Sequence, residues 1–199
     1  MDGLIKKMTQ IEKIQNLFNL EDIEIIRQCI IDSDQAGEDP NLGRLKIELN
    51  NLPPSIENKI SMLSVNLFNK NLDFANATYV EYNNKFGQPN LPAHFDHDDK
   101  DLVFDYQWEA NTSWDLGVGT EVYPLEDNSA IVFNANENIH WRPIKNFKDG
   151  EYVKMIFFRM NNKKKPSDYS HLDYVVEDKI FKSVNQFRDR LFNKGHNND

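Results

Sequence analysis

Seven short segments between residues 76 and 160 constrain the fold of this chain more than any other feature. Each is rich in aromatic and β-branched residues, and turn-forming residues separate it from the next. In order they are NATYVEYNN, DLVFDYQWE, SWDLGVG, TEVYPL, SAIVFNAN, NIHWRPI and EYVKMIFFRM. Successive strands with no helical pattern between them are typical of a sandwich or barrel. We therefore predict an all-β core over residues 76–160.

Helical spacing is confined to the two ends of the chain. Apolar residues recur every three or four positions within residues 20–34, 54–72 and 177–194, which predicts three amphipathic helices. The fold class that follows is mainly β with flanking helices. We predict a single domain over residues 1–199. Within it, residues 1–75 form a helical N-terminal support, residues 76–160 the β core, and residues 161–199 a loop and a C-terminal helix.

Charge and cysteine content exclude several classes of protein. The formal charge of −9 disfavours nucleic acid as a partner, because such a surface repels phosphate backbones. A lone cysteine, Cys29, cannot form an internal disulfide and lies in an apolar helical pattern. No apolar run approaches the roughly 20 residues that span a bilayer, and the N-terminus lacks an apolar signal core. We expect a cytoplasmic protein with no membrane segment.

Histidine and aspartate alternate in the stretch LPAHFDHDDKD, residues 91–101. Residues i and i+2 of a strand point to the same face, so His94 with Asp96, or His97 with Asp99, could hold one metal ion. A third ligand is available at His140, which the apolar Ile139 and Trp141 flank on a predicted strand. The other two histidines lie in loop-like sequence near the C-terminus. Two histidines and one carboxylate form the facial triad of non-haem Fe(II) oxygenases.

These segments resemble the Fe(II)/2-oxoglutarate-dependent dioxygenase superfamily. The stretch YVEYNNKFGQPNLPAHFD is similar to its prolyl-hydroxylase-like branch, in which a tyrosine, a glycine and a His-aromatic-Asp motif follow one another. PLEDNSAIVFNANENIHWRPI resembles the later strands of that branch, which carry its second histidine. The aromatic residue inside the motif assigns the first pair of ligands to His94 and Asp96.

The resemblance implies a double-stranded β-helix, a jelly-roll or cupin-like core. It implies Fe(II) held by His94, Asp96 and His140, with 2-oxoglutarate as cosubstrate, and it is compatible with ascorbate. The implied reaction uses O2 to hydroxylate a small molecule or a peptide or prolyl side chain, with release of succinate and CO2. Two alternatives remain open from the residues: a cupin-like metal enzyme that does not use 2-oxoglutarate, and a non-enzymatic β scaffold that serves as a binding module.

The sequence departs from the family pattern where the far carboxylate of 2-oxoglutarate is bound. Relatives carry a basic residue near positions 151 and 152, and here these are glutamate and tyrosine. Arg142, Lys154 and Arg159 remain as candidates. Arg142 shares the strand parity of His140, so we predict it as the anchor, with Lys154 next; the resemblance also suggests that Tyr82 contacts 2-oxoglutarate.

Overall fold

A computed structural model describes residues 10–33, 36–40, 42–89, 91–94, 96 and 100–161. The chain divides into residues 1–163 and 164–199, and every described residue lies in the first unit. The predicted C-terminal helix and the pair His97 and Asp99 therefore lie outside the described residues. The predicted domain boundaries remain a prediction.

All seven predicted strands and the first two predicted helices are confirmed. The helices are α1 (Leu20–Ile31) and α2 (Pro54–Phe68). The strands of the core region are β4 (Asp73–Asn83), β5 (Leu91–His94), β6 (Lys100–Ala110), β7 (Leu116–Val118), β8 (Glu121–Tyr123), β9 (Ser129–Phe133), β10 (His140–Arg142) and β11 (Tyr152–Asn161). Asn19 caps α1 in a capping box with Asp22, whose carboxylate also favours the positive end of the helix dipole.

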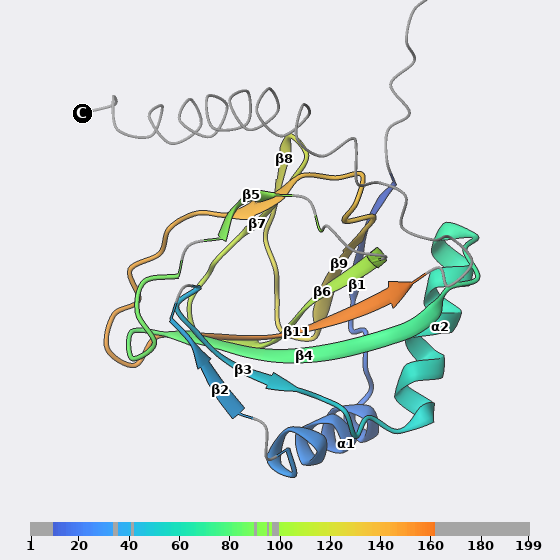
Figure 1. Cartoon of the computed structure of the whole chain (residues 1–199), viewed down its shortest axis with the longest axis horizontal. Coiled ribbons are helices and arrows are strands. Elements are labelled where there is room, and N and C mark those ends of the chain that lie inside the picture. The colour runs from blue at the N-terminus through green and yellow to red at the C-terminus, as the bar shows by residue number, and fades with distance from the viewer. Residues whose placement is uncertain are drawn as a thin grey trace, which may run out of the picture. The chain divides into compact units, whose positions relative to one another are not determined.

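The strands form two antiparallel sheets. The large sheet has the order β1-β9-β6-β11-β4-β3-β2, and the small sheet has the order β5-β10-β7-β8. From β4 to β11, successive strands mostly alternate between the two sheets, so that strands distant in the sequence become neighbours, which is the arrangement of a jelly roll. The mainly β, double-stranded β-helix prediction is therefore confirmed. Figure 1 shows the large sheet between the small sheet and the two helices.

The first 75 residues contain three strands that we did not predict. β1 (Ile11–Gln15) pairs with β9 at one edge of the large sheet. At the other edge, β3 (Arg44–Glu48) pairs with β4, and β2 (Ala36–Asp39) pairs with β3. Reading this region as helical support was incomplete, because these short strands carry glycine and charged residues and are held mainly by backbone pairing with their neighbours.

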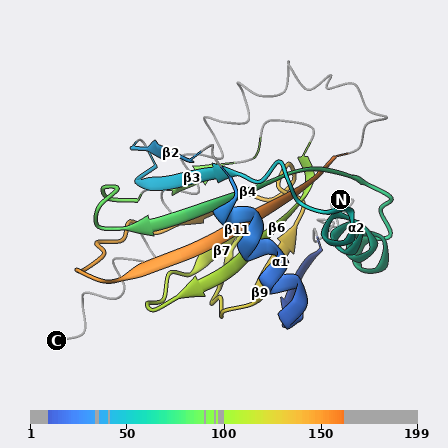
Figure 2. The ribbon, with the colours of Figure 1, turned by 90° about the horizontal axis from the view of Figure 1, so that it is seen from below.

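Two apolar layers cover the two faces of the large sheet. On the outer face, Ile26 of α1 and Ile56 and Ile60 of α2 pack against residues such as Phe104 and Phe158. Figure 2 shows both helices on this side of the sheet. On the inner face, which looks toward the small sheet, two further clusters are buried. They contain Val80, Tyr82, Trp114, Phe147, Val153, Met155 and Phe157, and Val103, Leu116, Val118, Ile131, Phe133 and Ala135.

Gly117 lets β7 approach β10 closely and predicts one measurable effect. It pairs with Trp141, and a Cβ at Gly117 would lie 2.1 Å from Cε2 of that buried indole. Because overpacking a core costs about 1–3 kcal/mol, we expect Gly117→Ala to lower the free energy of unfolding by that amount. Urea denaturation measures this. Gly37→Ala is the matched control, since nothing lies within 4 Å of a Cβ there, and equal effects of the two changes would contradict the prediction.

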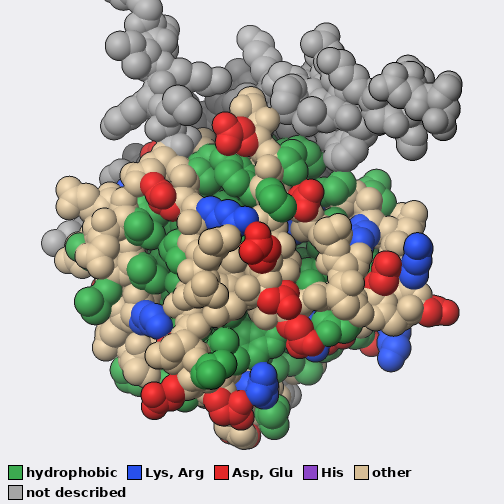
Figure 3. All heavy atoms as spheres, turned by 180° about the vertical axis from the view of Figure 1, so that it is seen from behind, with side chains coloured by type: hydrophobic (Ala, Val, Ile, Leu, Met, Phe, Trp, Pro, Cys, Tyr) green, Lys and Arg blue, Asp and Glu red, His purple; other side chains and the backbone are tan. Residues whose placement is uncertain are grey.

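On the face shown in Figure 3, positive and negative side chains of the described residues are mixed and form no patch of one sign. Lys and Arg side chains lie scattered among Asp and Glu side chains there. Neither of the described helices has the length and apolar character needed to cross a membrane.

Candidate metal centre

His94 and His140 face each other across the pair of strands at one edge of the small sheet. They are direct partners in the register of β5 and β10, and their ring centroids lie 4.2 Å apart. Side chains opposite one another in an antiparallel pair lie on the same face of the sheet. His140 is buried and packs against Phe133, with ring centroids 5.0 Å apart, whereas His94 is half-buried. Two residues 46 positions apart in the sequence are thus brought together (140 − 94).

Asp96 completes the group just beyond the end of β5. Its Oδ1 lies 3.7 Å from Nε2 of His94 and 3.7 Å from Nε2 of His140. The backbone N–H of Asp96 donates to the carbonyl oxygen of Ala135 at 3.1 Å, which ties this residue to the turn between β9 and β10. This hydrogen bond fixes the backbone of Asp96, so its side chain is held beside both imidazoles.

The turn before β10 orients His140. Nδ1 of His140 lies 3.3 Å from the carbonyl oxygen of Asn138. An imidazole protonated at Nδ1 donates to that oxygen and leaves the lone pair of Nε2 directed toward Asp96. Metal-binding histidines are commonly oriented in this way by an acceptor behind the ring. Burial, followed by the nearby His94, lowers the pKa of His140 to about 4, so its neutral form prevails at pH 7.

The low pKa of His140 predicts that acid destabilises the metal-free protein. The imidazole has a pKa near 6.5 when unfolded and about 4 when folded, so the unfolded chain binds more protons between these values. Stability that is present above pH 6.5 is lost as the pH falls toward 4, by on the order of 3 kcal/mol. Urea denaturation in EDTA at pH 7 and pH 4.5 measures the loss. His140→Gln should show a much smaller dependence, and an equal dependence would refute this origin.

The three side chains have the donor set that a divalent metal requires. One ligand atom from each of His94, Asp96 and His140 lies within 4.8 Å of the other two. Donors about 2.1 Å from one ion at right angles are about 3 Å apart, so a modest contraction brings all three into bonding range. Imidazole and carboxylate without thiolate suit Fe(II) with open coordination positions. The residues fit the metal that the sequence implied.

Arg142 lies on the same face of β10 as His140, as its parity predicted, but it already has a partner. Its guanidinium donates to Oδ1 of Asp105 on β6 at 2.8 Å and to the carbonyl oxygen of Trp114. Both members of the ion pair are buried, with side-chain exposures of 0% and 4%. Burial raises the pKa of Asp105, and Arg142 opposes that effect. Nε of Arg142 is buried and has no hydrogen-bond partner among the described residues.

Tyr82 also lies on the inner face, beside Arg142. Its ring packs edge-on against Trp114 with centroids 4.7 Å apart, and Arg142 stacks over the same tryptophan. The Tyr82 hydroxyl accepts a hydrogen bond from Arg44 at 3.4 Å. Burial raises the pKa of Tyr82, so the hydroxyl keeps its proton and can donate it in a hydrogen bond. Tyr82 and Arg142 thus present polar groups to the same interior region.

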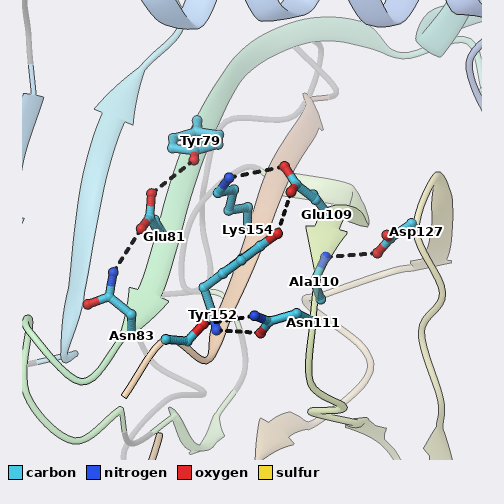
Figure 4. Close-up of polar contacts among 10 residues, drawn as sticks. Tyr79, Glu81, Asn83, Glu109, Ala110, Asn111, Asp127, Tyr152 and Lys154 are labelled. Atoms are coloured by element: carbon cyan, nitrogen blue, oxygen red, sulfur yellow. Dashed lines mark hydrogen bonds and ion pairs between the residues drawn. The ribbon is translucent and has the colours of Figure 1, made fainter. Parts of the chain in front are cut away.

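Lys154 lies on the other face of β11. Its ammonium group pairs with Glu109 at 3.0 Å, and the Tyr152 hydroxyl bonds to the same carboxylate. Figure 4 shows these groups beside Tyr79 and Glu81. Val153 and Met155, which alternate with Lys154 on the strand, belong to the inner cluster instead. The parity noted in the sequence, which groups Lys154 with Tyr152 and Ile156, is correct. That parity belongs to the outer face, where Ile156 packs against the helices.

Sequence reasoning missed two residues of the inner face and left a third unplaced. Asp105 was read only as part of a strand. An acid at a core-facing position of an apolar strand nevertheless indicates a buried charge that needs a partner. Arg44 was not considered, because β3 was not predicted. Arg159 was named as a candidate but not placed; the structure puts it on the inner face, where it donates to Thr78.

Comparison with solved structures identifies the fold. HygX from Streptomyces hygroscopicus, solved with nickel and 2-oxoglutarate bound, is 10% identical, covers 80% of this chain and 85% of its own, and has a TM-score of 0.60. A Pseudomonas putida prolyl-4-hydroxylase is 9% identical over 78% and 94%, with a TM-score of 0.56. The 2-oxoglutarate-dependent epimerase SnoN, from nogalamycin biosynthesis, is 10% identical over 84% and 85%, with a TM-score of 0.60.

No protein-family model matches the chain, and comparison with curated proteins gives no match. The solved structures nevertheless agree with one another. The chain therefore has the fold of the 2-oxoglutarate Fe(II) oxygenases, and the resemblance read from the sequence is confirmed for the fold.

Proposed function

We propose that this protein is a non-haem Fe(II)- and 2-oxoglutarate-dependent dioxygenase that oxidises a small molecule or a peptide side chain. The observation that carries the proposal is the convergence of His94, Asp96 and His140 inside a double-stranded β-helix. Structural neighbours with this fold include HygX, which binds nickel and 2-oxoglutarate. A group of these three residue types on this scaffold is the facial triad of the oxygenase class.

Each triad residue has a distinct part in holding the ion. His140 presents Nε2 as a neutral imidazole because it is buried and Asn138 accepts the proton on Nδ1. His94 supplies the second nitrogen from the opposing strand, and Asp96 supplies the negative charge between them. When bound, Fe(II) would supply the activation of O2 and the oxidation of 2-oxoglutarate to succinate and CO2. Three protein ligands leave coordination positions for these small molecules.

Arg142 is the better placed of the two predicted anchors for 2-oxoglutarate. It shares a strand and a face with His140 and lies two residues away, about 7 Å along the strand. Tyr82 faces the same region and keeps its hydroxyl proton. Lys154 lies on the outer face and would have to leave Glu109 to contribute. We therefore assign the far carboxylate to Arg142 and Tyr82.

The ion pair of Arg142 with Asp105 favours a second candidate function. A guanidinium that already has a carboxylate partner attracts a second one less strongly, because the pair is close to neutral. The second candidate is a cupin-like metal enzyme that does not use 2-oxoglutarate. Both candidates share the metal centre and differ only in this cosubstrate.

Binding of 2-oxoglutarate separates the two candidates. The protein is loaded anaerobically with Mn(II) and titrated with 2-oxoglutarate while tryptophan fluorescence is recorded, because Trp114 stacks on Arg142. We expect saturable quenching that depends on Mn(II), and succinate formation when Fe(II) and O2 replace Mn(II). Metal binding without any response to 2-oxoglutarate would favour the second candidate. Absence of metal binding would refute both and leave the binding scaffold.

A further inference from the structure

The charged side chains on the inner face of the large sheet come largely in pairs. Arg44 pairs with Asp39 at 3.1 Å, and Lys46 pairs with Glu48 at 2.5 Å on the same strand. Arg142 pairs with Asp105, as described above. Arg159 differs from these cations, since it makes no ion pair within 4.0 Å with any carboxylate of the described residues.

The Arg159 guanidinium donates hydrogen bonds only to neutral oxygens among the described residues. One terminal nitrogen donates to Oγ1 of Thr78 at 2.8 Å and to Oδ1 of Asn76 at 3.3 Å. Nε is buried and has no hydrogen-bond partner among the described residues. Burial lowers the pKa of Arg159, which reflects the cost of keeping this cation away from water. The residue as a whole is half-buried, and Thr78 in turn donates to the Glu48 carboxylate at 2.9 Å. A guanidinium remains charged in proteins, so a partly buried one without a carboxylate in direct contact is compensated only in part.

Arg159 lies near the metal ligands. It occupies the end of β11 and pairs in register with Val103. Val103 pairs in turn with Phe133, whose ring centroid lies 5.0 Å from that of His140. Among charged groups, the Asp96 carboxylate does most to raise the pKa of Arg159, ahead of Glu48 and Asp105. A divalent metal ion bound to Asp96 would offset the negative charge of that carboxylate. The guanidinium would then have still less compensation.

We propose that Arg159 binds a carboxylate of the organic substrate and holds that substrate beside the metal centre. This inference rests on the proposed function and specifies the substrate class: a small molecule or a peptide end that carries a carboxylate. An organic anion would place a carboxylate in direct contact with the guanidinium, which none of the described residues does. A guanidinium binds a carboxylate through two parallel hydrogen bonds, which would also use the nitrogens that Thr78 and Asn76 leave available.

The cosubstrate is the other source of a carboxylate near the metal. Arg142 and Tyr82 are assigned to it above. The Arg142 guanidinium donates to Asp105, which pairs with Phe157, and Arg159 lies two positions further along β11, about 7 Å along the strand. The two guanidinium groups are thus neighbours, and each can take one carboxylate when both acids are bound. We therefore assign the one at Arg159 to the substrate.

Matched ligand pairs test this assignment. Protein loaded anaerobically with Mn(II) and saturating 2-oxoglutarate is titrated with a panel of N-acetyl amino acids and with their carboxamides, and thermal denaturation reports binding. The two members of a pair differ in one charge. We expect the best acids to bind at least about 10-fold more tightly than their amides, because hydrogen bonds between charged partners contribute strongly. Arg159→Gln should remove the difference, and Arg27→Gln, which changes an exposed arginine on α1, should keep it.

Three results would overturn the assignment. The first is an equal affinity for acids and amides in the unaltered protein. The second is a preference for acids that survives in Arg159→Gln. The third is a loss of 2-oxoglutarate affinity in Arg159→Gln with the acid preference intact, which would make Arg159 the cosubstrate anchor. Arg159→Lys keeps the charge but not the paired donors, so it should weaken the preference without abolishing it, and it serves if Arg159→Gln does not fold.

The panel also separates failure of this inference from failure of the proposed function. The titration with 2-oxoglutarate is carried out first. If 2-oxoglutarate does not bind, the proposed function fails, and the ligand pairs are then tested with Mn(II) alone. A charge preference that depends on Arg159 under those conditions would keep the carboxylate site and reject the cosubstrate.

Discussion

We expect Asp96→Ala to abolish succinate formation and to lower Mn(II) affinity by more than about 100-fold. This exceeds the roughly 10- to 100-fold losses that follow removal of a residue that only orients a metal ligand. Asp96 is the only carboxylate in the triad, and its Oδ1 lies at the same distance, 3.7 Å, from Nε2 of both histidines. Removing it leaves two neutral ligands and no charge to offset a divalent ion. Isothermal titration with Mn(II) and a succinate assay with Fe(II), 2-oxoglutarate and O2 measure the two effects.

Asp149→Ala is the control for this experiment. Asp149 is an exposed aspartate in the turn before β11, and its carboxylate accepts a hydrogen bond from Asn84. We expect unchanged metal affinity and unchanged succinate formation in this variant. Thermal denaturation of the metal-free Asp96→Ala protein should show that it is folded. A folded Asp96→Ala protein that binds Mn(II) as tightly as the unaltered one would refute the metal centre.

The sequence predicted the strands of the core because their side chains carry the information. The segments from β4 to β11 combine aromatic and β-branched residues with clear turn signals, and they form the whole small sheet and the centre of the large one. β3 was missed for a physical reason. Three of its five residues, Arg44, Lys46 and Glu48, are charged, and such residues are uncommon in strands. Here the charged side faces the interior, because Glu48 bonds to Thr78 and Arg44 to Tyr82.

The candidate site was predictable where it depends on the alternation of side chains between the two faces of a strand. Spacing left two pairs open, and the resemblance to the oxygenase family selected His94 and Asp96, with His140 on a later predicted strand; the structure brings these three together. The parity of Arg142 was also sufficient to place it on the face of His140. Its partner was not predictable, since Asp105 lies 37 residues earlier and only the packing of the two sheets joins them. Parity likewise cannot say which face of a sheet is the inner one, so the sequence could not show that Lys154 lies on the outer face beside Glu109.

The buried pair of Arg142 and Asp105 predicts the largest effect on stability. Removing one member leaves the other as an uncompensated buried charge, so Arg142→Met or Asp105→Leu should each lower the free energy of unfolding by about 3–5 kcal/mol. The double variant should recover most of this loss, because an apolar pair of similar volume requires no desolvation of charge. Urea denaturation of the four proteins gives the coupling energy as a double-mutant cycle.

Arg27 and Glu24 on α1 form the matched control pair. Their side chains are 52% and 69% exposed, against 0% and 4% for Arg142 and Asp105, and exposed pairs contribute only about 0.3–0.5 kcal/mol. Equal coupling energies for the two pairs would show that burial does not govern the Arg142 interaction.

The double variant also separates the structural role of Arg142 from binding of the cosubstrate. If Arg142 anchors 2-oxoglutarate, the double variant is stable, binds Mn(II) through the intact triad, and no longer responds to 2-oxoglutarate. If the double variant still binds 2-oxoglutarate with unchanged affinity, Arg142 only holds the two sheets together, and the anchor lies elsewhere on the inner face. The single variants cannot make this distinction, because a loss of binding in them could follow from the loss of stability.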